Sequence, residues 1–108
     1  MLEGEVTVET DQPVTFTFTV TNTGDQPVSL QFRDACHADF AVFDGDEEIW
    51  RWSEGRMFAQ VLQESSLAPG EEESFEATWD DPETGTHTGY AELRASTTCE
   101  AETTFSVE

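Results

Sequence analysis

Four residues of the types that most often bind zinc are spread along the sequence: Cys36, His37, His87 and Cys99. Two thiolates and two imidazoles could in principle form a Cys2His2 site. Cys36 and His37 are adjacent, however, whereas the ligand pairs of such sites are separated by a few residues. The spacing does not favour zinc, and we predict neither a metal site nor a cofactor.

Two acidic stretches could offer oxygen ligands to calcium: residues 44–48 (DGDEE) and 80–83 (DDPE). Neither has the ligand spacing of an EF-hand loop, so we interpret both as solvated loops, with calcium as the alternative. Catalysis is not indicated either. Serine, histidine and aspartate occur, but the sequence contains no G-x-S-x-G nucleophile elbow and no glycine-rich phosphate loop. We therefore predict that the protein is not an enzyme.

The stretch 50–58, WRWSEGRMF, combines aromatic and positively charged residues. Trp50 and Trp52 would share one face of a strand, and Arg51 would lie on the other. Core packing explains the tryptophans, with an arginine stacked on one ring. The alternative is a partly exposed platform for a protein or a sugar, because Trp and Arg are enriched in interface hot spots. The candidate partner-binding residues are Trp50, Arg51, Trp52, Arg56, Met57 and Phe58.

The clearest structural pattern is at residues 14–21, VTFTFTVT, where apolar residues alternate with threonine. A period of two predicts a strand with one buried face, and threonine favours the extended backbone. Asn22, Gly24 and Pro27 then predict a turn, after which residues 28–32 resume the alternation. This hairpin-like segment is the element around which we expect the fold to be organised.

Further strands are predicted at residues 4–10, 38–44, 48–52, 74–79, 86–95 and 99–107. Turns are expected at residues 11–13 and at Gly45-Asp46, whereas residues 57–62 fit either a short strand or one helical turn. The sequence predicts an all-β protein, a single antiparallel β-sandwich domain of about eight or nine strands over residues 1–108.

The charge is strongly negative: 24 acidic residues stand against four arginines, with no lysine, for a net charge of −20. This charge would repel nucleic acids and anionic membranes. Molar salt reduces the Debye length to about 3 Å. A high-salt organism is therefore one explanation, and an acidic extracellular module that binds calcium is the other. No apolar run is long enough for membrane insertion, and no signal peptide is recognisable.

A resemblance to a known family rests on several motifs. Residues 18–32 read F-x-V-x-N-x-G-x-x-P-V-x-L-x-F, and Asp39-Phe40, Asp44-Gly45 and the 49–58 stretch IWRWSEGRMF follow. Residues 67–71, LAPGE, precede Phe75 and Trp79. This succession resembles the intracellular proteinase inhibitor (BsuPI) family over roughly residues 13–79. The resemblance implies an immunoglobulin-like β-sandwich that inhibits serine proteases. A subtilisin-like serine protease is our candidate partner. A general interaction or adhesion domain without inhibitory activity is the alternative.

If the protein inhibits a protease, residues 53–60 are the predicted contact loop. Gly55 permits an unusual turn there, and Met57 or Phe58 could fill an apolar specificity pocket.

The two cysteines carry a separate prediction. In an immunoglobulin-like order, residues 38–44 lie antiparallel beside residues 86–95, which brings Cys36 and Cys99 to one end of the sandwich. We predict a disulfide between them, stabilising by about 4 kcal/mol. A bridge would favour an extracytoplasmic location, and reduced thiols a cytoplasmic one. The oligomeric state is not indicated.

Overall fold

The computed structural model describes residues 1–11 and 13–108, and this part of the chain forms nine β-strands and no helix. No segment of it could therefore cross a bilayer as a helix. The turn predicted at residues 11–13 includes Gln12, which lies outside the described residues. The strands are β1 (Leu2–Glu9), β2 (Val14–Asn22), β3 (Val28–Phe32), β4 (Ala38–Asp44), β5 (Glu47–Arg51), β6 (Gln63–Leu67), β7 (Glu72–Trp79), β8 (Gly85–Leu93) and β9 (Cys99–Val107).

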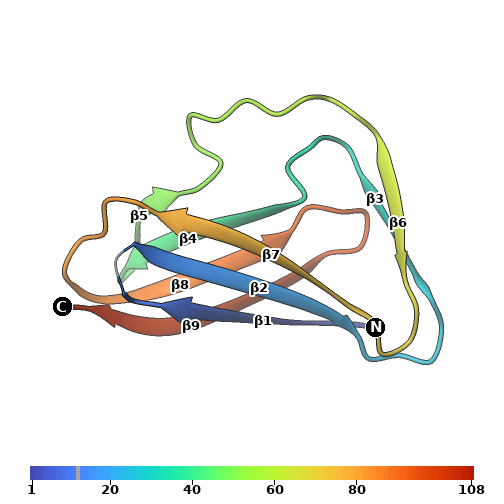
Figure 1. The fold of residues 1–108 in the computed structure, drawn as a ribbon, viewed down its shortest axis with the longest axis horizontal. Coiled ribbons are helices and arrows are strands. Elements are labelled where there is room, and N and C mark those ends of the chain that lie inside the picture. The colour runs from blue at the N-terminus through green and yellow to red at the C-terminus, as the bar shows by residue number, and fades with distance from the viewer. Residues whose placement is uncertain (12) are drawn as a thin grey trace.

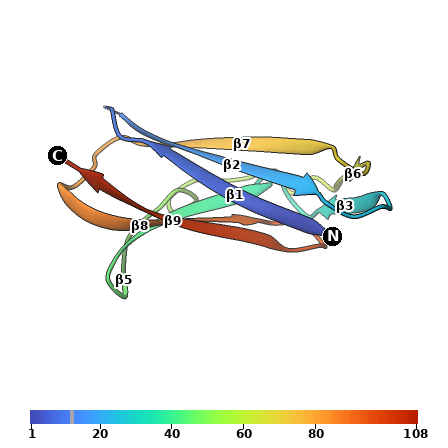
Figure 2. The same cartoon turned by 90° about the horizontal axis from the view of Figure 1, so that it is seen from below.

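These strands form antiparallel sheets in two layers. One layer has the order β1-β2-β7, the other has the order β5-β4-β8-β9, and β3 pairs with β6 as a separate two-stranded sheet. Figure 2 shows β2 and β7 above β4, β8 and β9, with β1 running obliquely at the side. The β3–β6 pair lies at one end of the molecule (Figure 1). The predicted all-β sandwich is confirmed.

The core forms where the alternating face of β2 meets the inner face of the opposite layer. Val14, Phe16, Phe18 and Val20 are fully buried, while the intervening threonines are only partly covered. The Phe16 ring lies 5.6 Å from Phe105 on β9, in an edge-to-face arrangement. Burying each such phenylalanine stabilises the fold by roughly 2–3 kcal/mol. The threonine–phenylalanine alternation thus places β2 at the centre of the fold.

Gly4 allows β1 to pack tightly against the opposite layer. A Cβ atom at this position would lie 2.9 Å from both the Cys99 sulfur and the Phe18 ring, and 3.1 Å from the Glu100 carbonyl. Such distances are too short for ordinary contacts. The missing side chain therefore lets β1 close the side of the sandwich next to β9.

The Asn22 side chain stabilises the end of the sandwich at which β2 ends. Its side chain is fully buried, and its amide nitrogen donates to the carbonyls of Gln26 at 2.8 Å and Leu67 at 2.9 Å. Its amide oxygen accepts from the Gly24 backbone at 2.9 Å. One side chain thus holds together its own turn and the end of β6, which explains the asparagine of the N-x-G motif.

Residues 57–62 form neither the strand nor the helical turn predicted for them. They are irregular, and Met57, Val61 and Leu62 are exposed. Strand β6 begins directly afterwards and was not predicted. Among its five residues, Gln63–Leu67, only Leu67 is buried, so no apolar alternation marks this strand. Its pairing with β3 holds it in place.

The predicted disulfide is wrong, because Cys36 and Cys99 are both free and buried. The pairing of β4 with β8 and the common end of the two cysteines are confirmed, since Leu93 is opposite both Ala38 and Cys99. Strand β8 lies between, however, so β4 and β9 are about 9.6 Å apart, beyond the ~7 Å reach of a disulfide. The argument for an extracytoplasmic location, which depended on this bridge, falls with it.

Burial also lowers the reactivity of the two cysteine thiols. It raises the pKa of the Cys36 thiol to about 11, and it raises the pKa of Cys99 as well. The Cys36 sulfur donates a hydrogen bond to the Ala38 carbonyl at 3.4 Å. Both thiols are therefore protonated at neutral pH, the form that reacts poorly with oxidants and metals.

Like charges face each other across the strands, and this leads to a prediction about salt. Glu92 is opposite Glu100, and Asp44 is opposite Glu47. Such pairs destabilise a sheet, and the net charge of −20 adds a general repulsion. We expect the melting temperature to rise by about 10 °C between 0.1 M and 3 M sodium chloride as screening takes effect. Calorimetry at several salt concentrations measures this, and a constant midpoint would contradict it.

Candidate functional site

A long loop between β5 and β6, residues 52–62, is the most exposed apolar feature of the molecule. We call it the β5–β6 loop. It runs along the long axis of the molecule, outside the sheets (Figure 1). Met57 is 98% exposed, and Leu62, at the other end of the loop, is 83% exposed. Apolar side chains held this far into solvent are typical of interaction sites.

Trp52 holds the loop on both sides of Met57. The Arg56 guanidinium lies 4.5 Å from the centre of the Trp52 ring, and the Arg56 Nε donates to the Trp52 carbonyl at 2.8 Å. The Phe58 ring is 5.6 Å from the Trp52 ring. The neighbours of Met57 therefore point back to one tryptophan, and Met57 points away. We call Trp52, Arg56 and Phe58 the tryptophan clamp.

Backbone contacts fix the rest of the loop. Gly55 has a φ of 79°, a left-handed conformation that favours glycine, as the sequence predicted. The Arg56 backbone donates to the Ser53 carbonyl at 3.2 Å, which closes this turn. Beyond Met57, the Ala59 carbonyl accepts from the Ala35 backbone at 3.0 Å. The segment that carries Met57 is thus anchored before and after its exposed residue.

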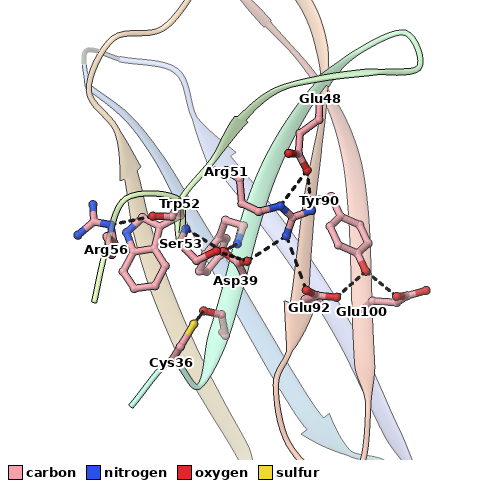
Figure 3. Close-up of polar contacts among 12 residues, drawn as sticks. Cys36, Asp39, Glu48, Arg51, Trp52, Ser53, Arg56, Tyr90, Glu92 and Glu100 are labelled. Carbon is pink, nitrogen blue, oxygen red and sulfur yellow. Dashed lines mark hydrogen bonds and ion pairs between the residues drawn. The ribbon is translucent and has the colours of Figure 1, made fainter. Parts of the chain in front are cut away.

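A buried aspartate on β4 supports the start of the loop (Figure 3). Asp39 is 1% exposed, and its carboxylate accepts from the Ser53 hydroxyl at 2.6 Å and the Ser53 backbone at 3.1 Å. Arg51 donates to the same carboxylate at 2.9 Å and pairs with Glu48 at 2.7 Å. Hydrogen bonds to Glu48 and Asp39 raise the pKa of the Arg51 guanidinium above its ordinary value. Both oxygens of the buried Asp39 carboxylate therefore accept hydrogen bonds, and one of them is paired with a guanidinium, as a buried charge requires.

The two tryptophans attach the same stretch to the core. Trp50 stacks on Phe16 at 5.7 Å and on Trp79 at 6.0 Å. Trp52 meets Phe40 edge-on at 6.4 Å, and its backbone donates to the Phe40 carbonyl at 2.8 Å. Along residues 50–53, the two tryptophans thus pack against the core, whereas Arg51 and Ser53 bind the Asp39 carboxylate. These contacts fix the position at which the β5–β6 loop begins.

A family profile described as BsuPI, intracellular proteinase inhibitor, matches residues 2–98 of the 108 residues. The chain therefore belongs to the intracellular proteinase inhibitor family. The match spans every strand that positions the β5–β6 loop. A search of curated proteins finds no match to the chain.

Within this family member, the six residues predicted to bind a partner divide into three groups. Trp50 and Trp52 are partly buried against the core, as the packing interpretation expected. Arg51 points to the opposite face, toward Asp39 and Glu92 (Figure 3). Arg56, Met57 and Phe58 lie in the loop, with Met57 outermost. The first three residues position the loop, and the last three are those that a partner could reach.

Asp39 is a site residue that the sequence interpretation missed, and the hydrogen bonds of Ser53 to it were not foreseen either. A carboxylate within the buried run of β4, Ala38–Asp44, was the available signal, because a buried acid needs a partner. Tyr90 was missed too. Its hydroxyl donates to Glu100 at 2.6 Å and lies 3.1 Å from a Glu92 carboxylate oxygen, and burial followed by the Glu100 hydrogen bond raises the pKa of Tyr90. This group extends the charged network behind Arg51.

The residues considered for metal binding do not come together. Cys99 is opposite Leu93, whereas His87 is six residues earlier on β8, about 20 Å along the strand. His87 is instead buried between Trp79 and Phe105, and its Nε2 bonds to the Glu83 carbonyl at 2.9 Å. Among residues 1–11 and 13–108, no three His, Cys, Asp or Glu side chains are grouped to hold a metal, the two acidic loops included.

Proposed function

We propose that the chain inhibits a serine protease by offering the β5–β6 loop as a substrate-like segment, with Met57 in the specificity pocket. The observation that carries this proposal is the 98% exposure of Met57 between two residues that are held by Trp52. A protease must accept its substrate as an exposed segment, with one side chain directed into a pocket. The family to which the chain belongs is one of proteinase inhibitors.

The anchoring of the loop supports inhibition rather than cleavage. A segment already held in its bound shape loses little conformational entropy on binding, so affinity rises. After cleavage, the tryptophan clamp and the Ala35–Ala59 hydrogen bond would keep both ends near each other, which favours resealing over release. A large apolar pocket of the subtilisin or chymotrypsin kind fits an unbranched methionine side chain.

The test exchanges the one side chain that enters the pocket. Met57→Asp is expected to weaken inhibition of a subtilisin-like protease at least 100-fold, because a charge would be buried without a partner. Met57→Arg is expected to shift inhibition toward trypsin-like proteases, whose pocket holds an aspartate. Inhibition constants measured in molar salt against both protease classes provide the comparison.

The matched control is Thr104→Asp, which adds the same charge at an exposed position on β9. It should inhibit as well as the unmodified protein. Unchanged inhibition by folded Met57→Asp would remove the β5–β6 loop as the contact. Binding without any inhibition would instead favour an interaction domain.

A further inference from the structure

The sulfur-containing side chains of the protein differ sharply in their exposure. The chain has two methionines and two cysteines. Cys36 and Cys99 are buried, and burial raises the pKa of both thiols, so they are protonated and react slowly with oxidants. Met57 is almost fully exposed, and Met1 is exposed as well. An oxidant in solution therefore meets the two thioethers before it meets either thiol.

The Met57 side chain also contributes little to the fold. Arg56 and Phe58, on either side of it, pack on Trp52, whereas Met57 points away from the clamp. Oxidation of a thioether to the sulfoxide adds one polar oxygen to the sulfur. At this position water would hydrate that oxygen, and the contacts of the tryptophan clamp would stay in place. The modification would therefore change the outermost side chain of the β5–β6 loop without unfolding the protein.

We propose that Met57 is a reversible oxidation site, and that conversion of its thioether to the sulfoxide switches off inhibition. The proposal rests on the proposed function, because it acts through the side chain that enters the specificity pocket. An apolar pocket would bury the sulfoxide oxygen without a hydrogen-bond partner, which is unfavourable. Binding to the protease should therefore weaken about tenfold or more.

Hydrogen peroxide is the oxidant that suits this protein. The sulfur forms a bond to one peroxide oxygen, the O–O bond breaks, and the other oxygen leaves as water with both protons. The sulfur loses two electrons and the peroxide gains them. Hydrogen peroxide is uncharged, so the net charge of −20 does not repel it as it would repel an anionic oxidant. Methionine sulfoxide reductases reverse the change with electrons from a dithiol, which becomes a disulfide as the oxygen leaves as water.

Binding and oxidation should oppose each other. When Met57 occupies a specificity pocket, the protease covers its sulfur and keeps peroxide away. By linkage, a modification that weakens binding is itself disfavoured by binding. Peroxide would therefore inactivate free inhibitor and spare inhibitor that is already bound to a protease.

Peptide mass spectrometry of the full chain after timed exposure to dilute hydrogen peroxide tests the modification site. Met57 should be oxidised at least as fast as Met1, with Cys36 and Cys99 unmodified. A subtilisin-like protease whose nucleophilic serine is replaced by alanine should slow oxidation of Met57 about tenfold or more and leave that of Met1 unchanged. Slower oxidation of Met57 than of Met1, or earlier oxidation of a cysteine, would overturn the site.

Inhibition constants measured before and after peroxide treatment test the effect on function, with Met57→Leu as the matched variant. Leucine has a similar volume and no sulfur, and this variant keeps Met1 and both cysteines. Each protein is compared with itself, so a different starting affinity of Met57→Leu does not enter the result. Peroxide should weaken inhibition by the unmodified protein about tenfold or more, and the reductases should restore it. Peroxide should not change inhibition by Met57→Leu, and circular dichroism verifies that the oxidised protein is folded.

The outcomes separate this proposal from the one on which it rests. Undiminished inhibition by protein that carries Met57 sulfoxide would overturn the switch and leave the inhibitory role in place. An equal loss in Met57→Leu would assign the effect to another residue and overturn the switch as well. Inhibition without protection of Met57 by the bound protease would overturn both the switch and the place of Met57 in the pocket. No inhibition of any subtilisin-like or trypsin-like protease by untreated protein would overturn the proposed function and the switch together.

Discussion

Replacing Asp39 by alanine is expected to lower the free energy of unfolding by about 3 kcal/mol. The carboxylate is 1% exposed and accepts hydrogen bonds from Arg51, from Ser53 and from the Phe40 backbone. Without it, buried donors lose their partner. Arg51 is 28% exposed and keeps Glu48, so we place the loss at the lower end of the range for broken buried pairs. Chemical denaturation provides the measurement.

Two further variants make this result specific. Asp44→Ala removes an exposed carboxylate from the end of the same strand and should change stability by less than about 0.5 kcal/mol. Asp39→Asn keeps the shape of the side chain but loses the ion pair with Arg51. Its stability should therefore lie between those of Asp39→Ala and Asp44→Ala. Equal stability of Asp39→Ala and Asp44→Ala would show that Asp39 does not hold the start of the loop.

Replacing Asn22 by alanine is the second change with a large expected effect, also about 3 kcal/mol. The side chain is fully buried, and its removal leaves the carbonyls of Gln26 and Leu67 and the Gly24 amide without partners. Each buried polar group left unpaired costs about 1–3 kcal/mol, and access of water to the opened turn offsets part of the sum.

Asn22→Asp tests which hydrogen bonds matter. Aspartate has the same shape and can still accept from Gly24, but it cannot donate to Gln26 and Leu67. It should therefore destabilise the protein at least as much as alanine does. Thr23→Ala, at the exposed next position, is the control. A stable Asn22→Asp protein would mean that the two donated bonds contribute little.

The parts of the fold that could be predicted are those in which side chains alternate between core and solvent. In β2, the buried faces of Phe16 and Phe18 and the outer threonines follow from a period of two. Strand β6 has no such signal, because its backbone pairing with β3 holds it and only Leu67 is buried. Backbone hydrogen bonds do not require particular side chains, so a strand held mainly by them cannot be recognised from its sequence.

The break in the pattern at residues 53–56 was predicted and is part of the β5–β6 loop, but the strand or helical turn predicted for residues 57–62 was wrong. Met57, Val61 and Leu62 are apolar, and apolar residues predict burial unless a partner is known. The role of Asp39 depends on Arg51 and Ser53, which are 12 and 14 residues away along the chain. The disulfide prediction failed for a related reason. It identified the shared end of two strands correctly but overlooked the width of β8 between them.

In the proposed inhibitor, the outward position of Met57 separates the side chain that would enter the protease pocket from the side chains that keep the protein folded. Trp52, Arg56 and Phe58 use their side chains to shape the loop, whereas the side chain at position 57 has almost no contact with the rest of the chain. On this proposal, a single codon change at position 57 would alter the target without lowering the stability of the fold. Related genes could keep pace with diverging proteases by varying this one position, and the same scaffold would serve as a starting point for selecting inhibitors in the laboratory.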